Sequence, residues 1–284
     1  MEWEGREQSS NVDDRRGRGI STGAVVGGGG GLILVLLALV LGVDPRQFMG
    51  KIGGNDPEGE QRAKDPAEER MADFAKVIFH DTEEVWDEQF RVMGKVYKKP
   101  TLVLFSDQVE SACGMQSAAV GPFYCPNDSK VYIDLSFFHT LEKQLGSPGE
   151  FARAYVLAHE VGHHVQRLLG YSARVDDARQ TMSKTENNKM SVRLELQADY
   201  LAGVWAHYGN KKYKFLKQGD LESATNAAFH IGDDVLQKQA RGRVSPDGFT
   251  HGTAKQRQRW FLEGFNTGDV KKARELFDLP YEKL

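Results

Sequence analysis

Cysteine is scarce in this chain of 284 residues, which contains only Cys113 and Cys125. Neither residue belongs to a C-x-x-C pair, so a cysteine-rich zinc ribbon is excluded. The two cysteines flank a turn-rich stretch. They can form a short-loop disulfide in an oxidising compartment or remain two free buried thiols. The residue pattern alone leaves both alternatives open.

An excess of either charge is also missing, because 37 Lys and Arg residues face 40 Asp and Glu residues and the net charge is −3. The sequence has no basic stripe with interleaved aromatic residues, so it predicts no nucleic-acid partner. Hydrophobic residues make up 40% of the chain and charged residues 27%, which is ordinary for a globular protein. The length is sufficient for one large domain or two small ones.

Charged residues are absent altogether between Ile20 and Val43. At about 1.5 Å per residue a helix of this length can cross a bilayer, so we predict a transmembrane helix over 20–43. The run Gly27–Gly31 precedes an apolar block, and small residues of this kind allow a partner helix to approach closely. The alternative is a cleaved signal peptide, but no small-x-small cleavage site follows the apolar block.

Basic residues around this apolar stretch predict its orientation. Arg15, Arg16 and Arg18 precede it, whereas Arg46 and Lys51 follow it. The excess on the N-terminal side favours a cytoplasmic N-terminus. The sequence therefore predicts a single-pass membrane protein whose main domain is extracytoplasmic; in a bacterium with two membranes this means an inner-membrane protein with its main domain in the periplasm.

Composition divides the chain into four regions. Residues 1–19 are polar and of mixed charge, which predicts a disordered cytoplasmic tail. The predicted transmembrane helix over 20–43 is followed by 44–65, a stretch rich in Gly, Pro and charge that reads as a linker. Residues 66–284 form the predicted folded domain. Its fold class is α+β, mostly helical with a small sheet.

Local patterns place the elements of this domain. Thr101–Phe105 reads as a buried strand, and the stretches 121–125 and 131–135 flank a turn and suggest a hairpin. Asp81 and Glu84 could form a second cap that interrupts the first helix. Helices are predicted over 66–94, 151–169, 172–182, 186–208, 220–240 and 253–265.

Residues 159–163 read His-Glu-Val-Gly-His, which is an H-E-x-x-H motif. Residues four apart share one face of a helix, so His159 and His163 can present two imidazoles to one metal ion. Glu160 then lies beside the metal, where a general base for the attacking water is needed. The stretch Ser147–Glu150 reads as a capping box that begins this helix.

A third metal ligand is expected on a later helix. Gln166 and Leu169 occupy the positions where the extended metzincin motif needs Gly and His, so that class is excluded. Glu195 and Asp199 are four apart among apolar residues, and carboxylates in such surroundings need a partner. We predict that Glu195 ligates the metal and that Asp199 accepts the free ring N–H of a ligand histidine. The competing third ligands are His164, His207, His230 and His251.

Long stretches of the chain resemble the bacterial family of neutral zinc metallopeptidases. The resemblance is carried by AYVLAHEVGHHVQ, RLELQADYLAGVWAH, GPFYCPNDSKVYIDLSFF, FTHGTAKQRQRWF and the opening EGREQSSNVDDRRG. It covers almost the whole chain and implies a zincin-like, gluzincin-like fold, a single Zn²⁺ ion and a membrane-tethered peptidase domain. By position it implies that His159 and His163 are the motif histidines, Glu160 the base and Glu195 the glutamate of the E-x-x-x-D motif. It does not imply a substrate.

These predictions combine into a membrane-anchored zinc endopeptidase that acts on a peptide or protein substrate. Glu160 takes a proton from the attacking water and delivers it to the leaving amine. The oxyanion needs a donor besides the metal. We predict His251, which lies in a loop before a capped helix, although a structural hydrogen bond in that loop is the alternative. Tyr124, Tyr132 and His230 are the other candidates.

The rival interpretation is a non-catalytic, zinc-stabilised binding or scaffold protein of the bacterial envelope. Such a protein needs the two histidine ligands but has no use for Glu160 as a base, so the intact motif favours the enzyme. Because the main domain is placed outside the cytoplasm in either case, we predict a disulfide between Cys113 and Cys125.

Overall fold

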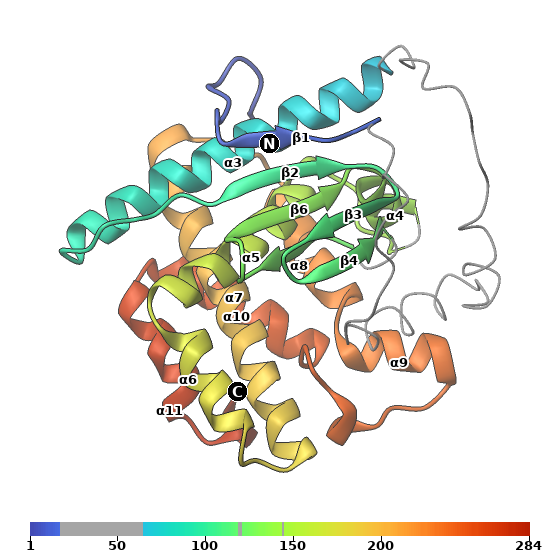
Figure 1. The fold of residues 1–284 in the computed structure, drawn as a ribbon, viewed down its shortest axis with the longest axis vertical. Helices are drawn as coiled ribbons and strands as arrows, with labels where there is room; N and C mark the ends of the chain where they lie inside the picture. Colours follow the sequence, from blue (N-terminus) through green and yellow to red (C-terminus); the bar gives the residue numbers. More distant parts are fainter. Residues whose placement is uncertain (18–64, 119–120, 144) are drawn as a thin grey trace.

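A small sheet packs against a larger group of helices in the computed structural model of this chain (Figure 1), which describes residues 1–17, 65–118, 121–143 and 145–284. β1 and β2 run parallel, as do β2 and β6, whereas β5 is antiparallel to β6. The spatial order in the sheet is β1 (Val12–Asp14), β2 (Thr101–Phe105), β6 (Lys130–Asp134) and β5 (Phe123–Cys125).

Helices supply most of the ordered chain, so the α+β class is confirmed for the described residues. Their bounds, in chain order, are α3 (Pro66–Val92), α4 (Ser136–Lys143), α5 (Glu150–Leu168), α6 (Tyr171–Arg179), α7 (Lys184–Tyr213), α8 (Asp220–His230), α9 (Asp233–Arg241), α10 (Ala254–Thr267) and α11 (Glu275–Asp278). Short 3₁₀ helices cover Pro246–Gly248, Val270–Arg274 and Tyr281–Lys283.

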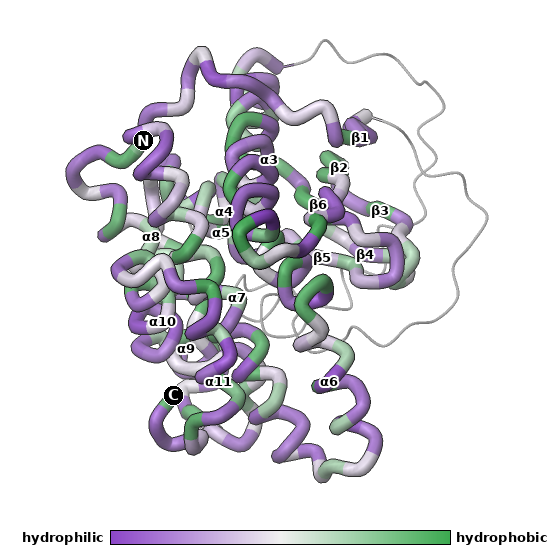
Figure 2. The backbone as a smooth tube through the Cα atoms, turned by 90° about the vertical axis from the view of Figure 1, so that its left-hand side faces the viewer, coloured by the Kyte–Doolittle hydropathy of each residue, from purple (hydrophilic) through white to green (hydrophobic). Residues whose placement is uncertain are grey.

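The two faces of the sheet pack against different neighbours because side chains alternate along each strand. Leu102 and Val131 belong to the large core that includes the helices, whereas Val103 and Tyr132 belong to a second, smaller cluster. That cluster includes Val109 of the hairpin formed by β3 (Gln108–Ser111) and β4 (Gly114–Ser117). In side view the hairpin lies on the opposite side of the sheet from α3 (Figure 2).

Two glycines allow α7 and α10 to pack at very short range. A Cβ atom placed on Gly203 would lie 2.1 Å from the carbonyl oxygen of Phe261, and one on Gly264 would lie 2.0 Å from that of Tyr200. A side chain at either position would therefore force the two helices apart. This close packing matters for function, because α7 and α10 both contribute residues around the metal centre described below.

The N-terminal segment, defined as residues 1–17, is packed into the fold, so the prediction of a disordered tail is wrong for these residues. β1 of this segment pairs with β2, and the side chains of Met1 and Trp3 are buried. No local pattern indicates this order, because a short polar segment acquires it only from partners far away in the chain.

Most local predictions in the main domain are confirmed. The strand over Thr101–Phe105 is β2, the predicted hairpin corresponds to β5 and β6, and the predicted helix over 151–169 corresponds to α5. The capping box at Thr253 also begins α10, with the Thr253 hydroxyl accepting from the backbone N–H of Gln256.

Three local predictions are wrong. The predicted capping box at Ser147 does not form, because Gly149 precedes α5 without a side-chain cap and the Ser147 hydroxyl donates to the carbonyl of Leu145. The first helix is not interrupted near Asp81, which instead faces Arg6 of the N-terminal segment. The helix predicted over 220–240 divides into α8 and α9.

No helix among the described residues is long and apolar enough to cross a membrane. The predicted transmembrane helix over 20–43 and its Gly27–Gly31 run lie outside the described residues.

Candidate metal centre

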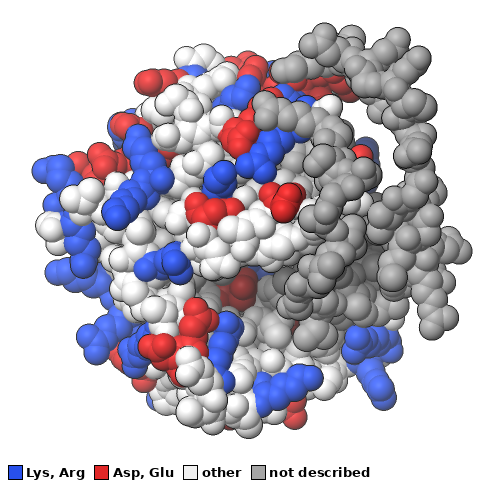
Figure 3. Space-filling view, viewed as in Figure 1, with Lys and Arg blue, Asp and Glu red and all other residues white. Residues whose placement is uncertain are grey.

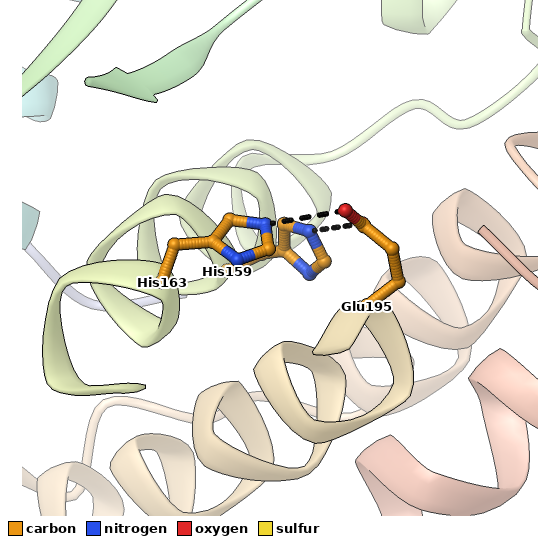
Figure 4. Close-up of side chains that lie close together, drawn as sticks. All are labelled: His159, His163 and Glu195. Atoms are coloured by element: carbon orange, nitrogen blue, oxygen red, sulfur yellow. Dashed lines mark hydrogen bonds and ion pairs between the residues drawn. The ribbon is translucent and has the colours of Figure 1, made fainter. Parts of the chain in front are cut away.

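His159 and His163 lie one turn apart on α5, and Glu195 projects toward them from α7 (Figure 4). His159 Nε2 is 3.2 Å from Glu195 Oε2, and His163 Nε2 is 3.6 Å from Glu195 Oε1. One possible ligand atom from each of the three residues lies within 4.8 Å of the others. The structure therefore brings together the three residues predicted as metal ligands.

The two imidazoles are held so that the same nitrogen of each ring faces the third ligand. Asp199 Oδ1 lies 2.8 Å from His159 Nδ1, and Gln166 Oε1 lies 2.9 Å from His163 Nδ1. Each acceptor favours the tautomer with the proton on Nδ1, which leaves Nε2 with its lone pair free. Two Nε2 atoms and one carboxylate are a donor set that suits Zn²⁺.

Close approach of α5 and α7 depends on the glycine inside the motif. A Cβ atom on Gly162 would lie 3.0 Å from the carbonyl oxygen of Ala198 and 3.2 Å from its Cα. A larger residue at this position would therefore press on the backbone of α7 and move Glu195 and Asp199 away from the histidines.

Asp199 is fully buried, and both oxygens of its carboxylate have hydrogen-bond partners. Its carboxylate accepts from Tyr155 Oη and from the Arg257 guanidinium, in addition to its contact with His159. Burial by itself would raise the pKa of Asp199, but Arg257 and His159 outweigh it, and the pKa is lowered. Asp199 is therefore an anion in contact with the His159 ring, which is the arrangement expected if Asp199 orients a ligand histidine.

Glu195, like Asp199, is a carboxylate whose ionised form is favoured despite its burial. Burial opposes its ionisation, yet His163, His251 and His159 together hold its pKa well below the usual value. Burial lowers the pKa of His159, but the carboxylates of Asp199 and Glu195 raise it more, to about 10. A metal ion bound through Nε2 would therefore displace a proton from this ring. The side chains of His163 and Glu195 each remain 20% exposed, so one side of the centre is open to solvent.

Glu160 lies next to the candidate ligands but does not belong to the group that could hold a metal ion. It is buried, and this burial raises its pKa even though His163 and His159 favour its ionised form. A hydrogen bond with the backbone of Tyr124 in β5 also acts on its carboxylate. A carboxylate with a raised pKa beside a metal site is suited to accept a proton from water.

His251 approaches the centre from the loop before α10. Its ring Nδ1 lies 3.2 Å from Asp233 Oδ1, and its backbone N–H donates to Asp233 Oδ2 at 2.6 Å. Burial lowers the pKa of His251, but Glu195 and Asp233 raise it more, and the net shift is upward. The ring is therefore held in place by Asp233, its cationic form is favoured over that of a free imidazole, and it acts electrostatically on Glu195.

The other candidate residues have different partners. His164 Nε2 lies 2.6 Å from the carbonyl of Lys98, and its Nδ1 lies 3.0 Å from Tyr124 Oη, so both ring nitrogens are engaged away from the ligands. His207 Nδ1 bonds to the carbonyl of Phe265. Tyr132 Oη donates to Asp128, and His230 lies at the end of α8 beside Gly146.

The disulfide between Cys113 and Cys125 is present and joins the turn of the β3–β4 hairpin to β5. The structure thus decides between the two alternatives that the sequence left open. Because β5 also contacts α5, the bridge ties the hairpin to the strand that lies beside the metal helix.

Gln166, Arg257, Tyr155 and Asp233 have roles at the site that the sequence analysis did not predict. Gln166 lies three residues after His163, a spacing that places both on one face of α5, so a local signal existed. The other residues lie far in sequence from the groups that they contact, and no local pattern marks them.

The space-filling view shows basic and acidic side chains mixed over the viewed face of the molecule (Figure 3). An acidic side chain is visible in the hollow between the sheet and the lower helices. The surface in this view thus offers no field of one sign that would favour a strongly charged substrate.

Comparison with known proteins agrees with this donor set. The chain matches a protein family described as "Putative neutral zinc metallopeptidase" over residues 1–275. It is similar to the uncharacterized protein YpfJ of Escherichia coli strain K12, with 47% identity over 280 residues, which are 95% of this chain and 96% of that protein. The uncharacterized protein Rv2575 of Mycobacterium tuberculosis strain H37Rv is 46% identical over 183 residues, 61% of each chain. No solved structure shows a significant match.

Proposed function

This chain belongs to the neutral zinc metallopeptidase family, and we propose that it is a zinc-dependent endopeptidase acting on peptide or protein substrates. The observation that carries the proposal is the convergence of His159, His163 and Glu195 within 4.8 Å, with Glu160 beside them. The family match and this geometry both support hydrolysis with a metal-activated water.

Zinc, when bound, would supply a Lewis acid and lower the pKa of water toward about 7. His159 and His163 would hold it through Nε2, and Glu195 through its carboxylate. Asp199 and Gln166 keep the two rings oriented, so the ligands need little rearrangement on binding. The exposed side of His163 and Glu195 leaves a route for water and substrate.

Glu160 acts as the general base in this proposal. It removes a proton from the water that attacks the peptide carbonyl, and it then delivers that proton to the nitrogen of the leaving amine. Its burial raises its pKa and so makes the carboxylate a stronger base than an exposed glutamate. The same position also explains why it does not ligate the metal: it lies one residue after His159 and turns away from the ligand face.

His251 is our proposed donor to the developing oxyanion. Asp233 fixes its ring through Nδ1 and its backbone through the N–H, and the nearby Glu195 favours the cationic form. A fixed cation of this kind stabilises negative charge at the substrate carbonyl without reorganising during the reaction. Tyr124 and Tyr132 are weaker candidates, because their hydroxyls are engaged with His164 and Asp128.

Membrane anchoring is a further part of the proposal and rests on the sequence alone. The uncharged stretch 20–43 has the length of a bilayer span, and its Gly27–Gly31 run suits a partner helix. Alkaline extraction of bacterial membranes tests it: the protein should stay in the pellet, and release into the supernatant would contradict anchoring.

Zinc analysis and peptide-library cleavage on one preparation test the enzymatic proposal. The full chain should contain one zinc per molecule, cleave library peptides, lose cleavage on treatment with a chelator and regain it when zinc is restored. A preparation that binds zinc but cleaves no peptide or protein offered would favour the non-catalytic scaffold. A folded, stable preparation without zinc would contradict both.

A further inference from the structure

The N-terminal segment, residues 1–17, forms an integral part of the body that carries the metal centre. β1 pairs with β2 over three residues in parallel, and the flanking backbone bonds from Leu102 N–H to Asn11 and from Arg15 N–H to Leu104 extend the ladder. β1 therefore occupies the edge of the sheet that β2 would otherwise expose.

Buried carboxylates of α3 depend on partners from this segment. Asp81 is 1% exposed and its Oδ2 lies 2.7 Å from the Arg6 guanidinium. Glu83 is 2% exposed and accepts from Ser9 Oγ at 3.1 Å and from Asn11 Nδ2 at 2.7 Å. A buried carboxylate without a partner destabilises the folded state. The stability of α3 therefore depends on the N-terminal segment.

Trp3 connects the segment directly to the metal helix. Its Nε1 donates to Glu150 Oε1 at 2.8 Å, and Glu150 is the first residue of α5. Its ring meets Phe74 of α3 edge-on at 5.4 Å between centroids, and the Arg70 guanidinium lies over it. A buried Trp that bridges two helices is a structural anchor rather than a loosely attached end.

We propose that the N-terminal segment and the metal centre lie on the same side of the membrane. Paired strands are about 4.8 Å apart, whereas the hydrocarbon core of a bilayer is about 30 Å thick. A single crossing of the membrane by residues 20–43 would put β1 and β2 in different compartments and prevent this pairing. If this stretch anchors the chain, it therefore does so without crossing the membrane only once. The disulfide between Cys113 and Cys125 places that common side in an oxidising, extracytoplasmic space.

This topology replaces the cytoplasmic N-terminus that the basic residues predicted. Arg15 bonds to Asp13, and Arg16 bonds to Asp14, so these two arginines are paired within the folded body. Arg16 also contacts acidic residues at the start of α3.

Labelling of two variants, each with one cysteine added to the parent chain, tests the proposal in cells. Ser10→Cys lies in the N-terminal segment and Lys271→Cys in the main domain, and both positions are exposed. The parent chain is the control, because its two cysteines are joined in the disulfide and should not react. A maleimide that does not cross membranes is added to spheroplasts and, separately, to lysed cells.

Both variants should react before lysis, and to a similar extent. Reaction of both only after lysis would also place them on one side and would move that side to the cytoplasm. Reaction of Lys271→Cys before lysis with Ser10→Cys protected until lysis, or the reverse, would overturn the proposal. The labelling needs no catalytic turnover, so its outcome is independent of the proposed peptidase activity.

Discussion

The structure of α5 and α7, the helices that carry the candidate ligands, can be predicted from local sequence, whereas that of the N-terminal segment cannot. The helices carry a four-residue spacing that places His159 and His163, and then Glu195 and Asp199, on common faces. The N-terminal segment has no such spacing and reads as a polar tail, yet Trp3 and Ser9 are as buried as the ligand His159. Local periodicity thus reveals a site, whereas order that comes from distant partners stays hidden.

Substitutions in the two regions should also have different effects. The metal centre is made of polar groups at an open side of the core, and its changes should reduce chemistry more than stability. The N-terminal segment contributes a strand, a buried Trp and partners for buried carboxylates, and its changes should reduce stability more than chemistry. Substitutions in each region test this division.

Glu160→Gln should lower peptide cleavage by at least about 10²–10⁴-fold, because general-base catalysis typically contributes that much. Zinc content and the unfolding midpoint should stay unchanged, since Glu160 is not a ligand and Gln has the same shape. His163→Ala is the contrasting variant and should lose both zinc and cleavage. If Glu160→Gln cleaves as fast as the parent chain, the proposed mechanism is wrong.

Trp3→Ala should lower the free energy of unfolding by about 3–5 kcal/mol, the usual cost of removing a buried large aromatic side chain. Phe229→Ala is the matched control: Phe229 is 37% exposed, so its loss should change the unfolding free energy by only about 0.5 kcal/mol. Denaturant unfolding of both variants gives the comparison. An equally small effect for Trp3→Ala would mean that the N-terminal segment does not support the fold.

Gln166→Leu should weaken zinc binding by about 10–100-fold, the usual effect of removing a group that orients a ligand histidine. Gln166→Glu keeps an oxygen acceptor for His163 Nδ1, although it loses the bond to the Leu194 carbonyl, and it should bind zinc more tightly than the Leu variant. Competition with a chromogenic chelator measures both affinities. Equal affinities for parent and Leu variant would remove Gln166 from the site.

The free energy of unfolding should depend on pH through Asp81, which contacts Arg6 of the N-terminal segment. Burial raises its pKa to about 7, against the opposing influence of Arg6 and Lys212 and with the help of Glu84. The folded chain therefore holds a proton that the unfolded chain releases near its usual pKa of about 3.9. The resulting stability is present in full below that value and is lost as pH rises through about 7.

Parallel unfolding titrations of the parent and Asp81→Asn between pH 5 and 8, the span set by the pKa of about 7, should show this difference. The unfolding free energy of the parent should fall relative to that of Asp81→Asn as the pH rises, because Asn has no proton to lose. Parallel curves for the two proteins would show that Asp81 does not titrate in this range in the folded chain.

Much of the main domain could be predicted from short stretches of sequence. The strand over Thr101–Phe105, the hairpin of β5 and β6, and the helices around the metal centre follow from alternation, turn residues and helical spacing. The failures are instructive: Ser147 has the residue type of a helix cap, but its hydroxyl bonds to Leu145 instead. The residue type determines which hydrogen bonds a side chain can form, and the surrounding structure determines which of them it does form.

The three candidate ligands and Glu160 can be identified from the sequence, because residues four apart in a helix share a common face. Three-dimensional packing is needed to see that Gly162 lets α7 approach α5, that Arg257 holds Asp199 from α10, and that the N-terminal segment completes the sheet. These contacts join residues far apart in the chain. Their energy comes from burial and pairing in the assembled core, which no local pattern encodes.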